Sequence, residues 1–202
     1  MFQRTQPSRA LLIAVLLACG VLQANAIQTD VNAKQSVTFK ARQQSLNATL
    51  HAVEKASWIA EGNGAHVVYI FFDPNCPYCH KLYEELRTRV GQNELQVRWI
   101  PVGILLPTSL GKAAAILDAK DPLLALRQNE EKFSATDGFG AVGEAFASPE
   151  AAKHLEQNSE LLKQVGGQSV PTLLFRDFTG QINVRQGAPS QQKLDALLAQ
   201  VR

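Results

Sequence analysis

The chain has 202 residues, of which 46% are hydrophobic and 19% charged, with a formal net charge of +2. This length is sufficient for one domain with a buried core. A charge so close to zero, without a basic patch, argues against a nucleic-acid partner.

The first 26 residues have the pattern of a secretory signal peptide. A basic segment precedes an apolar run over 10–22, and Ala24-Asn25-Ala26 follows as a cleavage site. The apolar run is too short for a membrane span. Removing 1–26 takes away two arginines and no acid, which leaves a formal net charge of zero. A lipoprotein signal that lipidates Cys19 is the less favoured alternative, because the A-x-A site is present.

Residues 27–62 are interpreted as a lead-in followed by a linker helix. The part over 27–40 is polar with a short apolar alternation, so we expect it to be extended. Apolar residues at helical spacing predict a helix over 43–60. Gly62 follows as the signal that ends this helix.

A strand, a helix and a second strand are predicted over 66–72, 77–90 and 95–102. A unit of this length implies parallel strands joined by a right-handed crossover. Helix-forming and capping residues predict a helical insertion over about 107–165, with a looser piece over 134–143.

The C-terminal part is predicted to contain a strand over 172–175, a hairpin to a strand over 181–184, and a final helix that Ser190 caps. The element order, with two thiols at the start of the first core helix, predicts an α/β protein with the thioredoxin fold. In this prediction the helical insertion separates a βαβ half from a ββα half. The catalytic domain is predicted over 63–202.

Cys76-Pro77-Tyr78-Cys79 joins the first core strand to its helix. Unpaired N–H groups and the helix dipole favour a thiolate at Cys76, so we expect this thiol to be partly exposed, to have a lowered pKa and to act as the nucleophile. Cys79 is expected to be buried and to act as the resolving thiol. Pro77 suits the first helical turn, where its missing N–H loses nothing. A static structural disulfide is the less favoured alternative.

Val170-Pro171 precedes the strand over 172–175. In the thioredoxin fold this peptide bond is cis and faces the redox pair, and its flanking backbone can pair with an extended substrate. We therefore predict that Val170 and Pro171 contribute to substrate binding. An ordinary proline at the start of a strand is the alternative, and it would be favoured if the C-x-x-C pair were absent.

Two polar residues near the redox pair are candidate modulators. Asp73 is expected to cap the turn before the helix, with proton transfer as the less favoured role. A protonated His80 would favour the Cys76 thiolate. Cys76, Cys79 and His80 lack a fourth ligand at a convincing spacing, so no metal site is predicted.

The segment Phe71–His80, FFDPNCPYCH, resembles the active-site segment of the bacterial periplasmic thiol:disulfide interchange proteins of the DsbC/DsbG family, and its CPYC is most similar to DsbG. The resemblance extends over about residues 50–202. It implies reduction or isomerisation of disulfides, or sulfenic-acid repair, in unfolded or misoxidised secreted proteins of the periplasm. It also implies a DsbD-like membrane thiol reductase as electron donor, and no cofactor besides the redox-active disulfide Cys76–Cys79.

The chain departs from this family in two ways, and from the thioredoxins in a third. Only about residues 27–42 precede the linker helix, which is too short for the family's N-terminal dimerisation domain, so a monomer or weak dimer is expected. Val170 stands where the family usually has threonine and resembles the DsbA oxidases, so a disulfide oxidase is the alternative function. Ile70 stands where thioredoxins and many relatives have a buried acid, which leaves the proton acceptor for Cys79 unassigned. Because CPYC also occurs in glutaredoxins, at about −200 to −230 mV, we expect a potential more reducing than that of DsbA.

Two functions outside the oxidoreductases stay open. A binding module of this fold would keep the cis-proline groove but need no paired thiols, so the intact pair counts against it. Cys76 to His80 also spell C-x-x-C-H, the attachment pattern of c-type haem, with His80 as the proximal ligand. The proline and the preceding strand make this the remoter alternative.

Overall fold

The computed structural model describes residues 34–134 and 139–202. Residues 34–44 are helical, and residues 45–202 form one compact unit. The expected signal peptide over 1–26, and the alternative lipidation of Cys19, lie outside the described residues and stay predictions.

The expected extended lead-in over 27–40 is wrong for its described part, because residues 34–40 are helical. Val37 and Phe39, whose alternation suggested an extended segment, are both exposed. Thr38 Oγ1 donates a hydrogen bond to Lys34 O at 2.9 Å, one helical turn back. Three residues of alternation are too few to outweigh the helix-forming lysine, glutamine and alanine residues around them.

The helix predicted over 43–60 ends at residue 53. Leu46, Leu50 and Val53 from this helix are buried in the core of the compact unit. Strand β1, Ile59–Glu61, follows instead of more helix and pairs antiparallel with β3. Gly62 therefore ends β1, with a φ of 81° that favours glycine.

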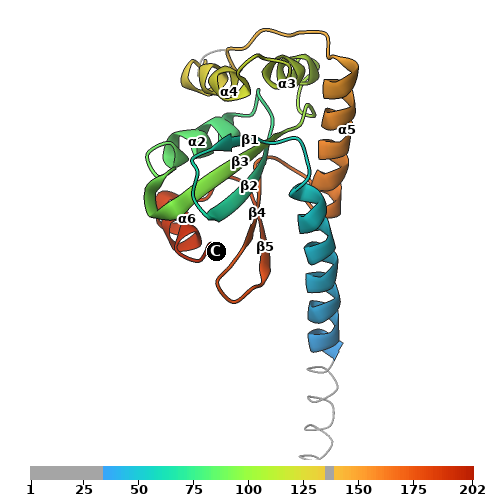
Figure 1. Ribbon diagram of the computed structural model, residues 1–202, viewed down its shortest axis with the longest axis vertical. Coiled ribbons are helices and arrows are strands. Elements are labelled where there is room, and N and C mark those ends of the chain that lie inside the picture. The colour runs from blue at the N-terminus through green and yellow to red at the C-terminus, as the bar shows by residue number, and fades with distance from the viewer. Residues whose placement is uncertain (1–33, 135–138) are drawn as a thin grey trace, which may run out of the picture. The chain divides into compact units, whose positions relative to one another are not determined.

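The sheet has five strands in the order β1-β3-β2-β4-β5 (Figure 1). Its other members are β2 (His66–Phe72), β3 (Leu95–Pro101), β4 (Thr172–Arg176) and β5 (Ile182–Gln186). β2 and β3 are parallel, whereas the other neighbouring strands are antiparallel. Val68 and the last four residues of β2 are buried, as expected for a central strand covered on both faces.

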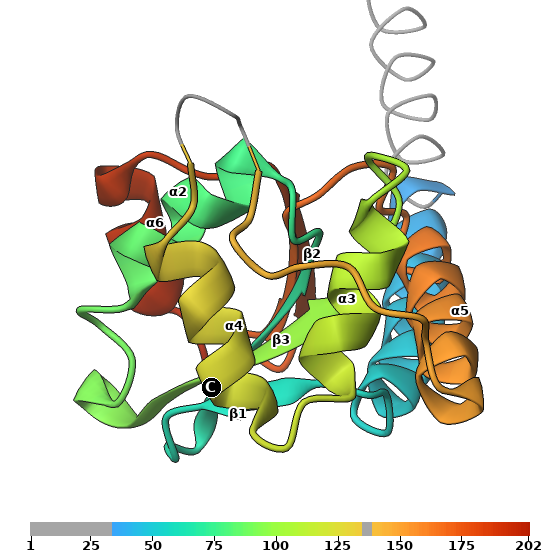
Figure 2. The same cartoon turned by 90° about the horizontal axis from the view of Figure 1, so that it is seen from above.

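The named helices are α2 (Pro77–Leu86), α3 (Ser109–Leu117), α4 (Pro122–Glu131), α5 (Pro149–Gln164) and α6 (Gln191–Leu198). Figure 2 shows α2 and α6 on one side of the sheet and α5 on the other. α3 and α4 lie beside each other, and α4 also packs against α2 and β1. The predicted helical insertion therefore reaches the helix that carries the thiols.

The predicted thioredoxin fold, with a helical insertion between its two halves, is confirmed by the order and pairing of these elements. Ser190 occupies the N-cap of α6, although its side chain makes no capping hydrogen bond. Among the described residues, no helix has the length and apolar character needed to cross a membrane.

Candidate active site

Cys76 is the N-cap residue of α2, directly after the loop that follows β2. Its backbone is extended, with φ −86° and ψ 112°, and Pro77 begins the helix. The Cys79 backbone N–H donates to Cys76 Sγ at 3.2 Å. The first thiol thus occupies the position of a capping oxygen, where an otherwise unpaired helix N–H stabilises negative charge.

Both thiols are free and buried, with 2% of Cys76 and 1% of Cys79 exposed. The expectation for Cys79 agrees with this, but the expectation that Cys76 is partly exposed is wrong. The Cys76 thiol lies against the loop before β4 and donates to Val170 O at 3.5 Å. A helix start seen in sequence does not reveal which distant loop covers it.

The two thiols have opposite pKa shifts. The pKa of Cys76 is lowered, chiefly by its hydrogen bond with the Cys79 thiol and further by the backbone N–H groups of Cys79 and Tyr78, against the effect of burial. The pKa of Cys79 is raised well above its ordinary value by burial, and by the hydrogen bond and charge of Cys76. The pair therefore ionises first at Cys76, as a nucleophile and resolving thiol require.

The two residues between the thiols form the outward side of the motif. Pro77 and Tyr78 are both exposed, and 65% of Tyr78 is accessible. A large aromatic ring thus lies in solvent next to a buried thiol, available to a polypeptide that approaches Cys76.

The Val170–Pro171 peptide bond is cis, and both residues are buried. Val170 O accepts from the Cys76 thiol, and Pro171 O accepts from Gly187 N at 2.8 Å. This loop therefore lies against the redox pair, as predicted. A substrate that pairs with the backbone of Val170 would therefore lie directly beside the Cys76 thiol.

Asp73 is fully buried and holds the loop between β2 and α2. Its Oδ1 accepts from Asn75 N at 2.9 Å and from Ser109 Oγ at 2.7 Å. Its Oδ2 accepts from the backbone N–H groups of Ile104 and Leu105 at 2.8 and 3.0 Å. Asp73 therefore does more than cap the turn before α2, because its four hydrogen bonds also connect this loop to the loop between β3 and α3.

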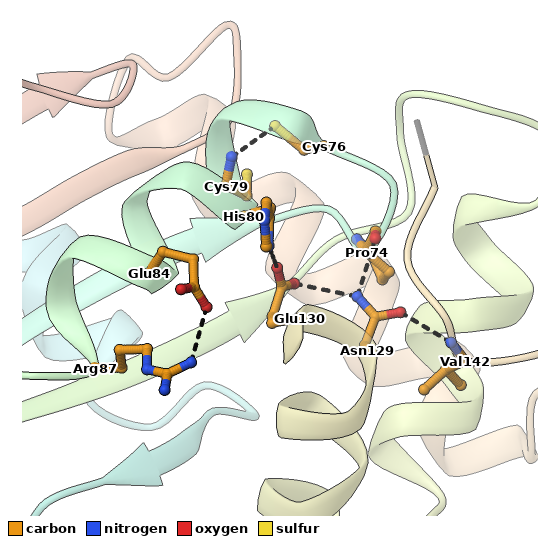
Figure 3. Close-up of polar contacts among 9 residues, drawn as sticks. All are labelled: Pro74, Cys76, Cys79, His80, Glu84, Arg87, Asn129, Glu130 and Val142. Carbon is orange, nitrogen blue, oxygen red and sulfur yellow. Dashed lines mark hydrogen bonds and ion pairs between the residues drawn. The ribbon is translucent and has the colours of Figure 1, made fainter. Parts of the chain in front are cut away.

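Polar residues of the insertion support the same loop, and sequence reasoning missed them. Lys112 Nζ donates to Asn75 Oδ1 at 2.9 Å and to Gly140 O at 2.6 Å. Asn129 Nδ2 donates to Pro74 O at 3.0 Å, as Figure 3 shows. Gly140 lies so close to Asn129 and Pro74 O that an added Cβ would collide with both. No local sequence pattern marks these contacts, because each joins residues far apart in the chain.

His80 and Glu130 form a partly buried pair beside Cys79. His80 Nδ1 lies 3.6 Å from Glu130 Oε2, and the imidazole stacks on the Phe133 ring at a centroid distance of 4.6 Å. The pKa of His80 is raised, chiefly by its interaction with the Glu130 carboxylate. Burial raises the pKa of Glu130, against the stabilising effects of His80 and Asn129. Glu130 was not predicted from the sequence as a site residue.

The described residues include no group of three or more histidine, cysteine or acidic side chains arranged to hold a metal ion. His80 is engaged with Glu130 and Phe133, and both thiols are buried. This arrangement does not favour the alternative of haem attachment, which needs both thiols and the imidazole at one porphyrin.

Residues 53–202 match the family model described as a thioredoxin-like domain. The chain therefore belongs to the thioredoxin-like family.

Within this family, the chain is 36% identical over 150 residues to the thiol:disulfide interchange protein DsbG of Pseudomonas aeruginosa, covering 72% of this chain and 57% of that protein. It is 30% identical over 149 residues to DsbG of Escherichia coli, covering 72% of this chain and 58% of that protein. The chain thus spans less than two thirds of the length of these relatives. The resemblance to DsbG inferred from the active-site segment is confirmed.

Two solved structures show the same fold. The catalytic domain of Proteus mirabilis ScsC matches with a TM-score of 0.61 and 20% identity, covering 78% of this chain and 96% of that one. A disulfide interchange protein from Neisseria gonorrhoeae matches with a TM-score of 0.53 and 24% identity, covering 70% of this chain and 93% of that one.

Proposed function

We propose that this chain is a thiol:disulfide oxidoreductase in which Cys76 attacks a substrate disulfide and Cys79 resolves the product. The observation that carries the proposal is the environment of the pair at the start of α2. Cys76 Sγ accepts a helix N–H and has a lowered pKa, whereas the neighbouring Cys79 has a raised one. The similarity to two proteins named DsbG supports the same chemistry.

The reaction begins when the Cys76 thiolate attacks one sulfur of the substrate disulfide. A mixed disulfide forms, and the other substrate sulfur leaves as a thiolate that takes a proton. Cys79 then loses its proton and attacks Cys76 Sγ, which forms the Cys76–Cys79 disulfide and releases the second substrate thiolate. The substrate gains two electrons and the protein loses them, so an external dithiol must reduce the pair again.

Isomerisation follows from the same intermediate. If a second thiol of the substrate attacks the mixed disulfide before Cys79 does, the substrate acquires a new disulfide and Cys76 leaves as thiolate. No net electrons are transferred. Reduction and isomerisation therefore differ only in which thiol reaches the mixed disulfide first.

The setting of this activity is proposed from the relatives. Proteins named as thiol:disulfide interchange proteins favour a periplasmic location, secreted proteins with wrong or unneeded disulfides as substrates, and a DsbD-like membrane reductase as electron donor. Repair of sulfenic acids on such proteins is a further activity of the same dithiol. No cofactor is required beyond the Cys76–Cys79 pair, and we expect a monomer or weak dimer.

The proposal is tested by following reduction of insulin with the wild type, Cys76→Ala and Cys79→Ala. Cys76→Ala should abolish the acceleration over a small thiol, because the nucleophile is absent. Cys79→Ala should accumulate mixed disulfides that a reducing agent releases. Equal insulin reduction by wild type and Cys76→Ala would support the binding module instead.

A DsbA-like oxidase remains the second candidate because Val170, not threonine, precedes the cis-proline beside Cys76. Equilibration with glutathione buffers separates the two functions. A potential near that of the glutaredoxins, about −200 to −230 mV, would favour reduction or isomerisation, whereas a value near about −120 mV would favour oxidation. Alkylation trapping of the pair in cells provides the matching readout, mostly reduced in the first case and mostly oxidised in the second.

A further inference from the structure

Cys79 has to lose a proton in a place where water hardly reaches it. Only 1% of the residue is exposed, and its pKa is raised well above the ordinary value. Strand β2 offers no acceptor at Ile70, which is a fully buried hydrocarbon side chain. Creating a buried thiolate without removing another negative charge nearby would be costly.

Glu130, in the last turn of α4, is a buried acid that pairs with His80, the residue directly after Cys79. Only 2% of it is exposed, and its charge is among the causes that raise the pKa of Cys79. Oε1 accepts from Asn129 Nδ2 at 3.1 Å. Oε2 has no hydrogen-bond donor among the described residues and faces His80 Nδ1 at 3.6 Å. One carboxylate oxygen is therefore fixed, and the other is available to take a proton.

His80 connects this carboxylate to solvent. The residue directly follows Cys79 on α2, and Figure 3 shows Glu130 pointing from α4 towards its ring. The imidazole side chain is 29% exposed and is held by stacking on Phe133. A partly exposed imidazole with two exchangeable nitrogens can carry a proton between a buried group and water.

We infer that Glu130, paired with His80, accepts the proton of Cys79 when Cys79 displaces the substrate from Cys76, and that His80 returns this proton to solvent. The inference rests on the proposed function and adds its missing proton acceptor. It places the acid on the insertion, across from the thiols, rather than on strand β2.

The step balances in atoms and charge. The proton leaves Cys79 Sγ for Glu130 Oε2 as the Cys79–Cys76 sulfur–sulfur bond forms and the bond from Cys76 to the substrate sulfur breaks. The substrate sulfur leaves as a thiolate and is protonated by water. Because Glu130 becomes neutral as Cys79 loses its proton, the core gains no second negative charge, and the negative charge leaves with the substrate thiolate.

Other ionisable groups act on this site. Asp73 and Cys76 act on Cys79, and Glu84 acts on both His80 and Glu130. Tyr83, on the same helix, stays neutral because burial raises its pKa. Lys112 from α3 is bound to Asn75 Oδ1 and Gly140 O. These groups are common to every variant in the test below, so differences between variants report on Glu130 and His80.

The test measures the two steps of reaction with oxidised glutathione by rapid mixing over a range of pH. The first phase, attack by Cys76, depends on glutathione concentration, whereas the second phase, resolution by Cys79, does not. The variants are wild type, Glu130→Gln, His80→Gln and the control Glu131→Gln. Glu131 is the exposed neighbour of Glu130 on the same helix, so its variant makes the same chemical change away from the thiols.

Glu130→Gln should slow the second phase at neutral pH by at least about tenfold, as expected for loss of a positioned base, with the first phase nearly unchanged. Its second-phase rate should rise steadily with pH, because hydroxide must now take the proton, where the wild type reaches a plateau. His80→Gln should show a smaller loss, and Glu131→Gln should follow the wild type. Should Glu130→Gln fold poorly, Glu130→Asp keeps the acid and should keep a plateau.

Three results would overturn the inference. The first is a second phase in Glu130→Gln that equals the wild type at every pH. The second is a faster second phase in Glu130→Gln, which would make Glu130 only a negative charge that opposes the thiolate. The third is a second phase slowed as much in Glu131→Gln as in Glu130→Gln. Absence of both phases in the wild type would instead contradict the proposed function itself.

Discussion

The Cys76 thiol donates a hydrogen bond to the backbone carbonyl of Val170, 94 residues away, over 3.5 Å. The nucleophile and the predicted substrate-binding loop are therefore in direct contact before any substrate arrives. The side chain that precedes the cis-proline lies within this site, and its chemistry should affect the thiolate.

Val170→Thr is expected to make the pair more oxidising, although valine is the residue that resembles the DsbA oxidases. A hydroxyl at this position adds a donor near Cys76, which stabilises the thiolate and hence the reduced protein. A net gain of about 1 kcal/mol corresponds to a shift of roughly 20 mV for a two-electron couple. Equilibration with glutathione buffers measures it. Val170→Ala is the control, since it alters packing without adding a donor, and an equal shift in both variants would contradict the explanation.

The stability of the reduced protein should depend on pH in two opposite ways. A lowered folded pKa at Cys76 contributes stability that is complete above the unfolded value of about 8.5 and lost as pH falls through the folded pKa. A raised folded pKa at Cys79 contributes stability that is complete below about 8.5 and lost as pH rises above it.

Urea unfolding of the reduced protein across this pH range checks both effects. Cys76→Ser should lack the gain in unfolding free energy on the approach to about pH 8.5. Cys79→Ser should lack the loss at higher pH. A Cys76→Ser curve parallel to the wild type would show that this thiol has an ordinary pKa.

Asp73→Asn is expected to destabilise the fold by about 2–4 kcal/mol, because an amide group would face N–H donors that the buried carboxylate now accepts from. Denaturant unfolding provides the measurement. Asp118→Asn makes the same change at an exposed carboxylate that accepts from Ser148, and should cost less than about 1 kcal/mol since water can replace it. Similar losses for the two variants would argue against the loop-holding role of Asp73.

Tyr78→Ser should lower kcat/KM for a polypeptide disulfide by about fivefold, because the exposed ring offers an aromatic contact of about 1 kcal/mol beside the thiol. The rate with oxidised glutathione should change little. Tyr78→Phe keeps the ring and should behave as the wild type. If Tyr78→Ser slows both substrates equally, the ring acts on the thiol rather than on the substrate.

Sequence reasoning succeeded where the signal is local. The apolar run of β2, the capping position of Cys76 and the strand after Pro171 each depend on a few consecutive residues, and the structure has them where expected. The cover over Cys76 and the acid at Glu130 depend on contacts across the fold, which no spacing in the chain reveals.

The error of extending the predicted helix into β1 also has a physical cause. β1 has three residues, too few for an alternating pattern, and it pairs with β3, a partner distant in the chain. Trp99 and Arg127 both donate to the buried Glu61 carboxylate of β1 at 3.0 Å. The helix was predicted to continue to Ile59 because this residue has helical spacing from the earlier apolar residues. Ile59 instead faces the same core from strand β1.

Glu130 lies in the helical insertion, so the acid proposed to accept the proton and the two thiols are on different elements of the fold. Sulfur reactivity comes from the start of α2, whereas proton handling is proposed to come from α4. A chimaera that exchanges only residues 107–165 with those of a relative would therefore change the groups proposed to handle the proton of Cys79, while Cys76 keeps its position at the start of α2.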